Sequence, residues 1–173
     1  MTEVAQMPDI VQNGKPKRMG RLNVELGSIT QHNIMQLKKL NEAVFPVAYN
    51  SRFYKDVVTS GDLGKFVFFN DCVVGAVCCR IDIEEGVKKL YIMTLGTLAP
   101  YRRLGIGSML LNHVFSLCEK DKGIKSVTLH VQINNESALD FYQKFGFQKS
   151  GVAENYYKRI EPSSAYILEK EDN

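Results

Sequence analysis

One stretch near the middle of the chain, LYIMTLGTLAPYRRLGIGSMLL at residues 90–111, constrains the fold more than any other. Residues 90–98 are mostly apolar and predict a buried strand. Pro100 has no N–H to donate to a neighbouring strand, so we expect the strand to end there. Residues 102–108 form a basic, glycine-containing turn that leads into an apolar helix. Because the N–H groups of such a turn and of a helix N-terminus point towards an anion, the stretch predicts a site for a phosphate-bearing ligand.

The length and composition of the chain fit one globular domain. It has 173 residues, of which 45% are hydrophobic and 24% charged, enough for a core of its own. The net charge of +3 is too small to predict nucleic-acid binding by itself. No apolar run reaches the ~18 residues of a membrane span, and the polar N-terminus lacks the apolar core of a signal peptide. We therefore expect no membrane partner and no direct nucleic-acid partner.

The four cysteines do not have the spacing of a metal site. None makes a C-x-x-C pair and no histidine lies at zinc-finger spacing, so we expect no bound metal. Cys72, Cys78 and Cys79 lie in apolar strand sequence. Reduced, buried thiols in a cytoplasmic protein, with the nucleus as a second compartment, explain them more simply than zinc does.

Hydrophobic periodicity predicts one domain at residues 21–170, after a flexible N-terminal extension at residues 1–20. Apolar residues at three- and four-residue spacing predict helices, and alternation predicts strands. In chain order, we expect a strand at 21–26, helices at 34–44 and after 50, strands at 65–69, 72–83 and 87–98, a helix at 106–120, a strand at 126–133, a helix at 136–145, and strands after 147 and at 165–168.

The connections between these elements predict how the strands pair. A helix joins the strands at 87–98 and 126–133, which implies that these two lie parallel as neighbours. Short connections elsewhere imply antiparallel pairs. Thr30 is the expected N-cap of the first helix, and Asn50 or Ser51 that of the second.

The pattern Arg102-x-x-Gly105-x-Gly107, in this order of elements, resembles the coenzyme motif of the GNAT superfamily of acetyl-CoA-dependent N-acetyltransferases. A dinucleotide site would need a third glycine, and an NTPase P-loop would need G-x-x-x-x-G-K-[ST]; neither is present. Three further segments, FPVAYN at 45–50, LAPYRR at 98–103 and NYYKRIEP at 155–162, resemble the NatE type of N-terminal acetyltransferases. The resemblance covers about residues 21–170.

The resemblance implies a fold and an activity. The fold is α+β: a central, mostly antiparallel twisted sheet with one parallel neighbour pair, flanked by about four helices. The activity is transfer of acetyl from acetyl-CoA to the N-terminal amine of peptides that retain Met, followed by a hydrophobic residue. Expected partners are N-terminal peptides of nascent proteins, subunits of the NatA complex and the ribosome. The alternatives are a lysine acetyltransferase and a non-catalytic subunit of such a complex.

The resemblance also implies two sets of binding residues. The expected coenzyme contacts are Leu95, Thr97, Arg102, Arg103, Leu104, Gly105, Ile106, Gly107, Ser108, Asn135, Ser137 and Tyr142. The expected peptide contacts are Phe45, Pro46, Val47, Tyr49, Met93, Tyr156, Tyr157 and Ile160. The two apolar segments among the peptide contacts should face each other across the thioester, although hydrophobic cover alone would also explain them.

Three side chains are candidates for the chemistry. The resemblance implies that Tyr91 and His130 act as bases through an ordered water, and that Tyr142 protonates the leaving thiolate. The ordinary pKa of His, ~6.5, suits a base at neutral pH better than that of Tyr, ~10. Either the pKa of Tyr91 is shifted, or Tyr91 orients water while His130 takes the proton. We also expect a β-bulge at residues 94–96 to free an N–H group for the oxyanion.

Overall fold

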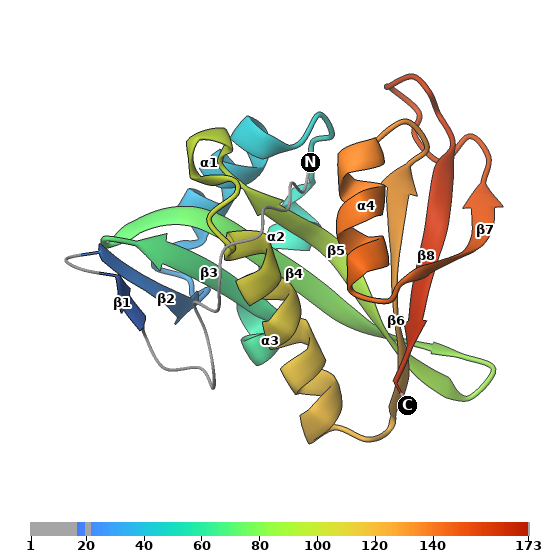
Figure 1. The fold of residues 1–173 in the computed structure, drawn as a ribbon, viewed down its shortest axis with the longest axis horizontal. Helices are drawn as coiled ribbons and strands as arrows, with labels where there is room; N and C mark the ends of the chain where they lie inside the picture. The colour runs from blue at the N-terminus through green and yellow to red at the C-terminus, as the bar shows by residue number, and fades with distance from the viewer. Residues whose placement is uncertain (1–16, 20–21, 173) are drawn as a thin grey trace.

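The computed structural model describes residues 17–19 and 22–172 and is built on one mixed sheet (Figure 1). The strands are β1 (Lys17–Met19), β2 (Leu22–Ser28), β3 (Gly64–Phe69), β4 (Cys72–Glu84), β5 (Val87–Thr97), β6 (Ile124–Gln132), β7 (Gln148–Ala153) and β8 (Ala165–Glu171). The α-helices are α1 (Ile34–Val44), α2 (Ser51–Thr59), α3 (Ile106–Lys120) and α4 (Glu136–Lys144). Short 3₁₀ helices cover Gly61–Leu63 and Ala99–Tyr101.

The sheet has the pairing that the connections predicted. Its strand order is β1-β2-β3-β4-β5-β6-β8-β7. Every neighbouring pair is antiparallel except β5 and β6, which α3 connects and which run parallel. The expected α+β fold, with four α-helices in the described residues and one parallel neighbour pair, is therefore confirmed.

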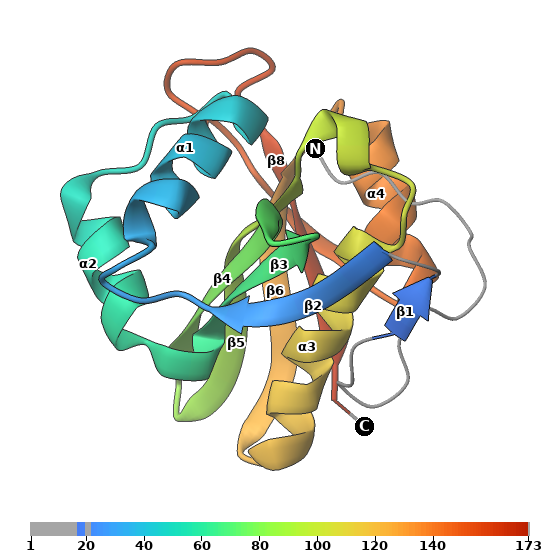
Figure 2. The same ribbon diagram turned by 90° about the vertical axis from the view of Figure 1, so that its left-hand side faces the viewer.

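The helices cover both faces of the sheet. Figure 2 shows α1 and α2 on one side, and α3 and α4 on the other. Beneath α3 and α4 lies the larger core, whose fully buried members include Leu90, Leu110 and Phe141. Beneath α1 and α2 lies a smaller core around Leu37 and Phe66. Two cores on opposite faces hold the sheet rigid from both sides.

Local sequence determines where the helices begin. Asn50 caps α2 by accepting from Phe53 N at 3.0 Å, and Asn135 caps α4 by accepting from Ala138 N at 3.2 Å. The expectation that Thr30 caps α1 is wrong. Its hydroxyl accepts from His32 N in the preceding turn, and α1 begins only after Asn33, whose side-chain oxygen accepts from Thr30 N.

The N-terminal expectations are met only in part. Residues 17–19, which we placed in the extension, pair antiparallel with β2 as strand β1. The rest of the extension, residues 1–16 and 20, lies outside the described residues. All four cysteines are free thiols. Cys78 and Cys79 are buried as expected, and Cys118 is buried too, whereas the expectation of a buried Cys72 is wrong, because it lies exposed at the start of β4.

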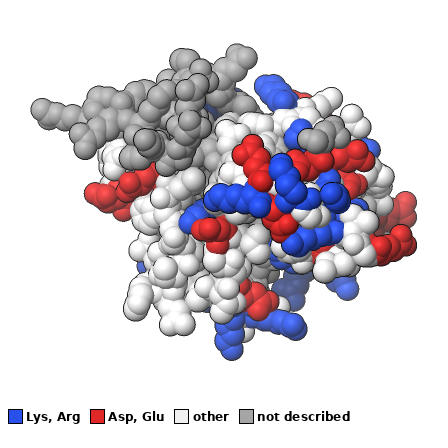
Figure 3. Space-filling view, turned by 90° about the horizontal axis from the view of Figure 1, so that it is seen from below, with Lys and Arg blue, Asp and Glu red and all other residues white. Residues whose placement is uncertain are grey.

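At the end of the molecule where β6 begins and β8 ends, basic side chains form ion pairs with acidic ones. Figure 3 shows basic and acidic side chains interspersed on this face. Lys89 bridges Glu84 at 3.3 Å and Glu169 at 3.2 Å, and Lys88 pairs with Asp121. Such exposed pairs contribute little stability individually. Within the described part of the chain, no helix is both long and apolar enough to cross a membrane.

Candidate active site

The site forms where β5 and β6 diverge. Their parallel register runs from Lys88 opposite Ile124 to Tyr91 opposite Thr128, after which both strands continue to Thr97 and Gln132 without further register pairs. A cavity of about 560 Å³ lies beside the diverging segments. The strand ends, rather than a flexible loop, therefore provide two of its walls.

A bulge in β5 adds to this divergence. Cys78 lies opposite Thr94 and Cys79 opposite Ile92, so Met93 is the extra residue on β5. The bulge is thus centred on Met93, and our placement of it at residues 94–96 is wrong. The cross-strand pairing with β4 fixes its position, and a bulge leaves its extra residue without a ladder partner. Met93 itself lines the cavity.

The cavity gathers many of the expected site residues from five parts of the chain. Those that line it are Phe45, Pro46, Val47, Tyr49, Met93, Leu95, His130, Asn135, Tyr142, Tyr157 and Ile160. The segment between α1 and α2 and the segment between β7 and β8 therefore do face the same space. Gln132 Nε2 donates to Pro162 O at 2.9 Å and ties the second of these segments to β6.

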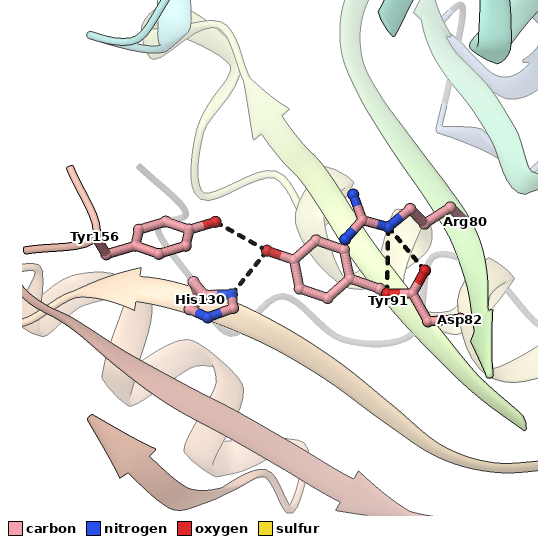
Figure 4. Close-up of polar contacts among 5 residues, drawn as sticks. All are labelled: Arg80, Asp82, Tyr91, His130 and Tyr156. Carbon is pink, nitrogen blue, oxygen red and sulfur yellow. Dashed lines mark hydrogen bonds and ion pairs between the residues drawn. The ribbon is translucent and has the colours of Figure 1, made fainter. Parts of the chain in front are cut away.

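Three polar side chains make a continuous hydrogen-bonded array at the edge of the cavity (Figure 4). The hydroxyl of Tyr91 lies 2.7 Å from Nδ1 of His130 and 3.1 Å from the hydroxyl of Tyr156. The His130 ring also stacks on the Tyr156 ring, with centroids 4.2 Å apart and planes at 7°. Residues from β5, β6 and the β7–β8 segment thus hold one another in place, and His130 alone of the three lines the cavity.

Burial shifts the pKa values of the two candidate bases in opposite directions. It raises the pKa of Tyr91 from its ordinary value of 10.0, and the hydrogen bond to Tyr156 raises it further. Burial lowers the pKa of His130 from 6.5, and the positive charge of Arg80 adds to this. At neutral pH, Tyr91 therefore keeps its proton, while the imidazole of His130 is neutral and can accept one. These directions favour the alternative in which His130 takes the proton, and that role stays a prediction.

Arg80 on β4 is a neighbour of this array that sequence reasoning missed. It lies opposite Tyr91 in the β4–β5 register, with its guanidinium carbon 4.5 Å from the centre of the Tyr91 ring. Arg80 Nε donates to Oδ1 of Asp82 at 2.9 Å, which holds the guanidinium in place (Figure 4). A cation over the face of an aromatic ring is attracted to it, so Arg80 also helps to fix the ring.

The turn after β5 has the geometry expected of an anion site. β5 ends at Thr97, and Pro100 lies in the 3₁₀ helix that follows, as predicted. Arg102 Nε donates to Thr97 O at 3.3 Å across the turn. Arg103 has a φ of 62° and Gly105 a φ of 77°, and Gly105 is the N-cap of α3. The first N–H groups of a helix have no intrahelical partner, so those of Ile106, Gly107 and Ser108 face outwards from the helix end.

The expected coenzyme residues fall into two groups. Thr97 and the residues of the turn, Arg102 to Ser108, do not line the cavity; Thr97 ends β5 two residues beyond the lining residue Leu95, and the turn leads into α3. On the other side, Asn135 lines the cavity and Ser137 is exposed on the first turn of α4. Tyr142 is 3% exposed, lines the cavity and packs against Phe141 and Phe147. The two helix N-termini thus stand on either side of the gap between β5 and β6.

The end of the cavity where the peptide is expected carries aromatic side chains. Tyr49 lies edge-on to Phe45, with ring centroids 6.2 Å apart. Burial raises the pKa of Tyr49, and the neighbouring Tyr157 and Tyr156 raise it further. Burial also raises the pKa of Tyr157 to about 12. These hydroxyls remain protonated at neutral pH and can donate or accept hydrogen bonds.

Several lining residues had no signal in the sequence. Val44, Ile92, Ala138 and Gln132 line the cavity but look like ordinary core or surface positions of their elements. Their position next to predicted site residues was the available clue. Among the described residues, no group of His, Cys, Asp or Glu could hold a metal ion.

Comparison with known proteins agrees with this geometry. Residues 34–147 match the Acetyltransferase (GNAT) family. The chain is 61% identical over 147 residues to N-alpha-acetyltransferase 50 of Danio rerio, covering 85% of this chain and 88% of that protein. It is 57% identical over 152 residues to the probable N-acetyltransferase san of Drosophila melanogaster, covering 88% and 83%.

The fold also matches a solved structure of the same kind. Arabidopsis thaliana Naa50, in complex with the bisubstrate analogue CoA-Ac-MVNAL, superposes with a TM-score of 0.80 and 48% identity, over 85% of this chain and 97% of that one. The motif, the diverging strands and these relatives agree with one another. The chain therefore belongs to the GNAT acetyltransferase family and is an N-alpha-acetyltransferase.

Proposed function

We propose that this enzyme acetylates N-termini that retain Met followed by a hydrophobic residue. The observation that carries the proposal is the apolar end of the cavity, where Phe45, Pro46 and Val47 face Tyr157 and Ile160. A pocket enclosed from two sides accepts a chain end with a long apolar side chain. It hinders a lysine in the middle of a chain, because that chain would have to continue in both directions. The bisubstrate analogue CoA-Ac-MVNAL, bound to the Arabidopsis relative, begins its peptide with Met-Val and supports the proposal.

The residues present fit acetyl-CoA. The left-handed conformation at Gly105 turns the chain so that the N-terminus of α3 faces the ligand side, and nothing lies within 4 Å of where a Cβ would be. Arg102, Arg103 and the N–H groups of residues 106–108 would hold the diphosphate. Asn135 and Ser137 would contact the pantetheine arm. Acetyl-CoA, when bound, supplies a thioester whose carbonyl carbon accepts the amine.

His130 is the terminal acceptor of the amine proton in this proposal. An α-amino group has a pKa of ~8 and must lose a proton before it can attack. Because the proton of Tyr91 stays on its oxygen, the 2.7 Å contact fits Tyr91 as donor and Nδ1 of His130 as acceptor. The Tyr91 oxygen can then accept a proton from the amine through an ordered water, as it passes its own to Nδ1. The phenol thus never has to become a phenolate.

Two further groups complete the transfer. As the C–N bond forms and the C–S bond breaks, the carbonyl oxygen gains negative charge and the sulfur leaves as a thiolate. Main-chain N–H groups around the Met93 bulge are suited to the oxygen, since the bulge residue has no ladder partner. The Tyr142 side chain is suited to protonate the thiolate, because Tyr142 lines the cavity from α4.

A peptide panel with acetyl-CoA tests the proposal. Peptides that differ only in residues one and two should show kcat/KM highest for Met-Leu and lower by about tenfold or more for Ser-Glu. An internal lysine in an N-terminally blocked peptide is the matched control for side-chain acetylation. Equal rates for Met-Leu and Ser-Glu, or faster acetylation of the lysine, would contradict the proposal.

Partners and location follow only from the motif resemblance. On that basis we propose that the enzyme acts on nascent chains in the cytoplasm, with the nucleus as a second compartment, and that it associates with NatA subunits at the ribosome. Co-sedimentation with translating ribosomes, with and without NatA, tests this association. Absence from the ribosomal fraction in both cases would contradict it.

A further inference from the structure

A glycine in β5 lies directly behind the apolar wall of the cavity. Gly96 pairs with Ala76 on β4 and has no side chain where α1 ends. A Cβ built there would lie 2.7 Å from Cζ of Phe45 and 2.7 Å from Cγ1 of Val44. Both distances are below 3.0 Å, which real Cβ atoms essentially never show. The Phe45 ring and Val44 therefore occupy the space that any other residue at position 96 would need.

Backbone conformation does not explain this glycine. Its φ is not among the positive values of the chain, so an L-residue could adopt the same backbone. What requires glycine here is the close approach of two side chains, and both of them line the cavity. Gly151 in β7 is a useful contrast, because a Cβ there would meet only Cδ1 of Ile167, at an ordinary contact distance of 3.4 Å.

We propose that Gly96 determines the depth of the pocket for the first substrate side chain. The absence of a Cβ lets the tip of the Phe45 ring lie directly against Gly96 on β5, and the depth of the apolar end of the cavity depends on that position. A methyl group at 96 would displace the ring away from the sheet, because β4 and β5 close the opposite side. The ring would move towards the space for the first residue. The inference rests on the proposed function, since it assumes that this space receives that residue.

The substitution Gly96→Ala tests the inference. The variant should lose about tenfold or more in kcat/KM for a Met-Leu peptide. An Ala-Leu peptide, whose first side chain is three heavy atoms shorter, should lose much less. The ratio between the two peptides should therefore fall by about tenfold. Isothermal titration with acetyl-CoA should give an unchanged affinity, because the turn at 102–108 is not touched.

Two further variants make the outcome decisive. Gly151→Ala, a strand glycine with room for a methyl, should leave the ratio unchanged. Gly96→Ala combined with Val44→Ala and Phe45→Leu removes both groups that the new methyl would meet, and should restore the ratio to that of the Val44→Ala/Phe45→Leu enzyme, even where Gly96→Ala alone folds poorly. If Gly96→Ala keeps the wild-type ratio, or if the combined variant is not rescued, the inference is overturned. If wild-type enzyme shows no preference for Met-Leu, the proposed function fails instead.

Discussion

The array of Tyr91 and His130 allows a double-mutant cycle that separates a relay from two independent bases. Tyr91→Phe removes a hydroxyl that makes hydrogen bonds at 2.7 Å to His130 and 3.1 Å to Tyr156. It keeps the ring 4.5 Å from the Arg80 guanidinium carbon. His130→Gln removes the terminal acceptor. In a relay, each change interrupts the same proton path.

The expected magnitudes follow from these contacts. Two neutral hydrogen bonds are worth about 1–3 kcal/mol of folding stability together, so Tyr91→Phe should remain folded. Loss of general-base catalysis costs about 10²–10⁴-fold in kcat, or about 3–5 kcal/mol of barrier. Each single variant should show a loss in this range. The double variant should be no slower than His130→Gln, because residues that act as one unit are not additive.

Steady-state kinetics on a Met-Leu peptide, with thermal denaturation and acetyl-CoA titration as controls, give all four corners of the cycle. Coenzyme affinity should stay near the wild-type value in every variant. A double variant whose loss equals the product of the two single losses would show that the two residues act independently. That result would refute the relay, as would full activity in Tyr91→Phe.

Two other perturbations follow from the same geometry. The pKa of His130 lies below 6.5, so the acidic side of the kcat/KM–pH profile should fall only below that pH. Arg80→Gln removes a positive charge that disfavours the imidazolium, so this fall should begin at a higher pH in the variant. A profile that does not move would contradict the role of Arg80. Gly105→Ala should lower the free energy of unfolding by about 1–2 kcal/mol, because an L-residue is strained at a φ of 77°. It should also weaken acetyl-CoA binding in a calorimetric titration and leave the peptide preference the same. An unchanged affinity would argue against this turn as the phosphate site.

Much of the fold could be predicted because its signals are local. An apolar run predicted β5, alternating residues predicted β6, and the helix that joins them implied that they run parallel. Pro100 lies three residues after the end of β5 at Thr97, and Gly105 immediately precedes α3, so both marked their boundaries closely. The two apolar segments that face each other across the cavity were predicted from their resemblance to a family, since periodicity alone does not bring residues 45 and 157 together.

The features that escaped prediction depend on register between strands. The bulge lies at Met93 because Cys78 pairs with Thr94, and nothing within β5 itself specifies this. Arg80 reaches Tyr91 only because the two are register partners. A shift of one residue would place Arg80 on the other face, so the sequence does not specify this contact. The hydrogen bond between Tyr91 and Tyr156 joins positions 65 residues apart.

The short parallel register between β5 and β6 has a mechanical consequence. Four residue pairs join one half of the sheet, β1 to β5, to the other, β6 to β8. A molecule bound between the diverging strands would contact both halves and restrict their motion relative to each other. Local opening between the two halves should therefore become rarer when the co-substrate binds. Backbone amide hydrogens of β5 and β6 along the gap should then exchange more slowly with solvent.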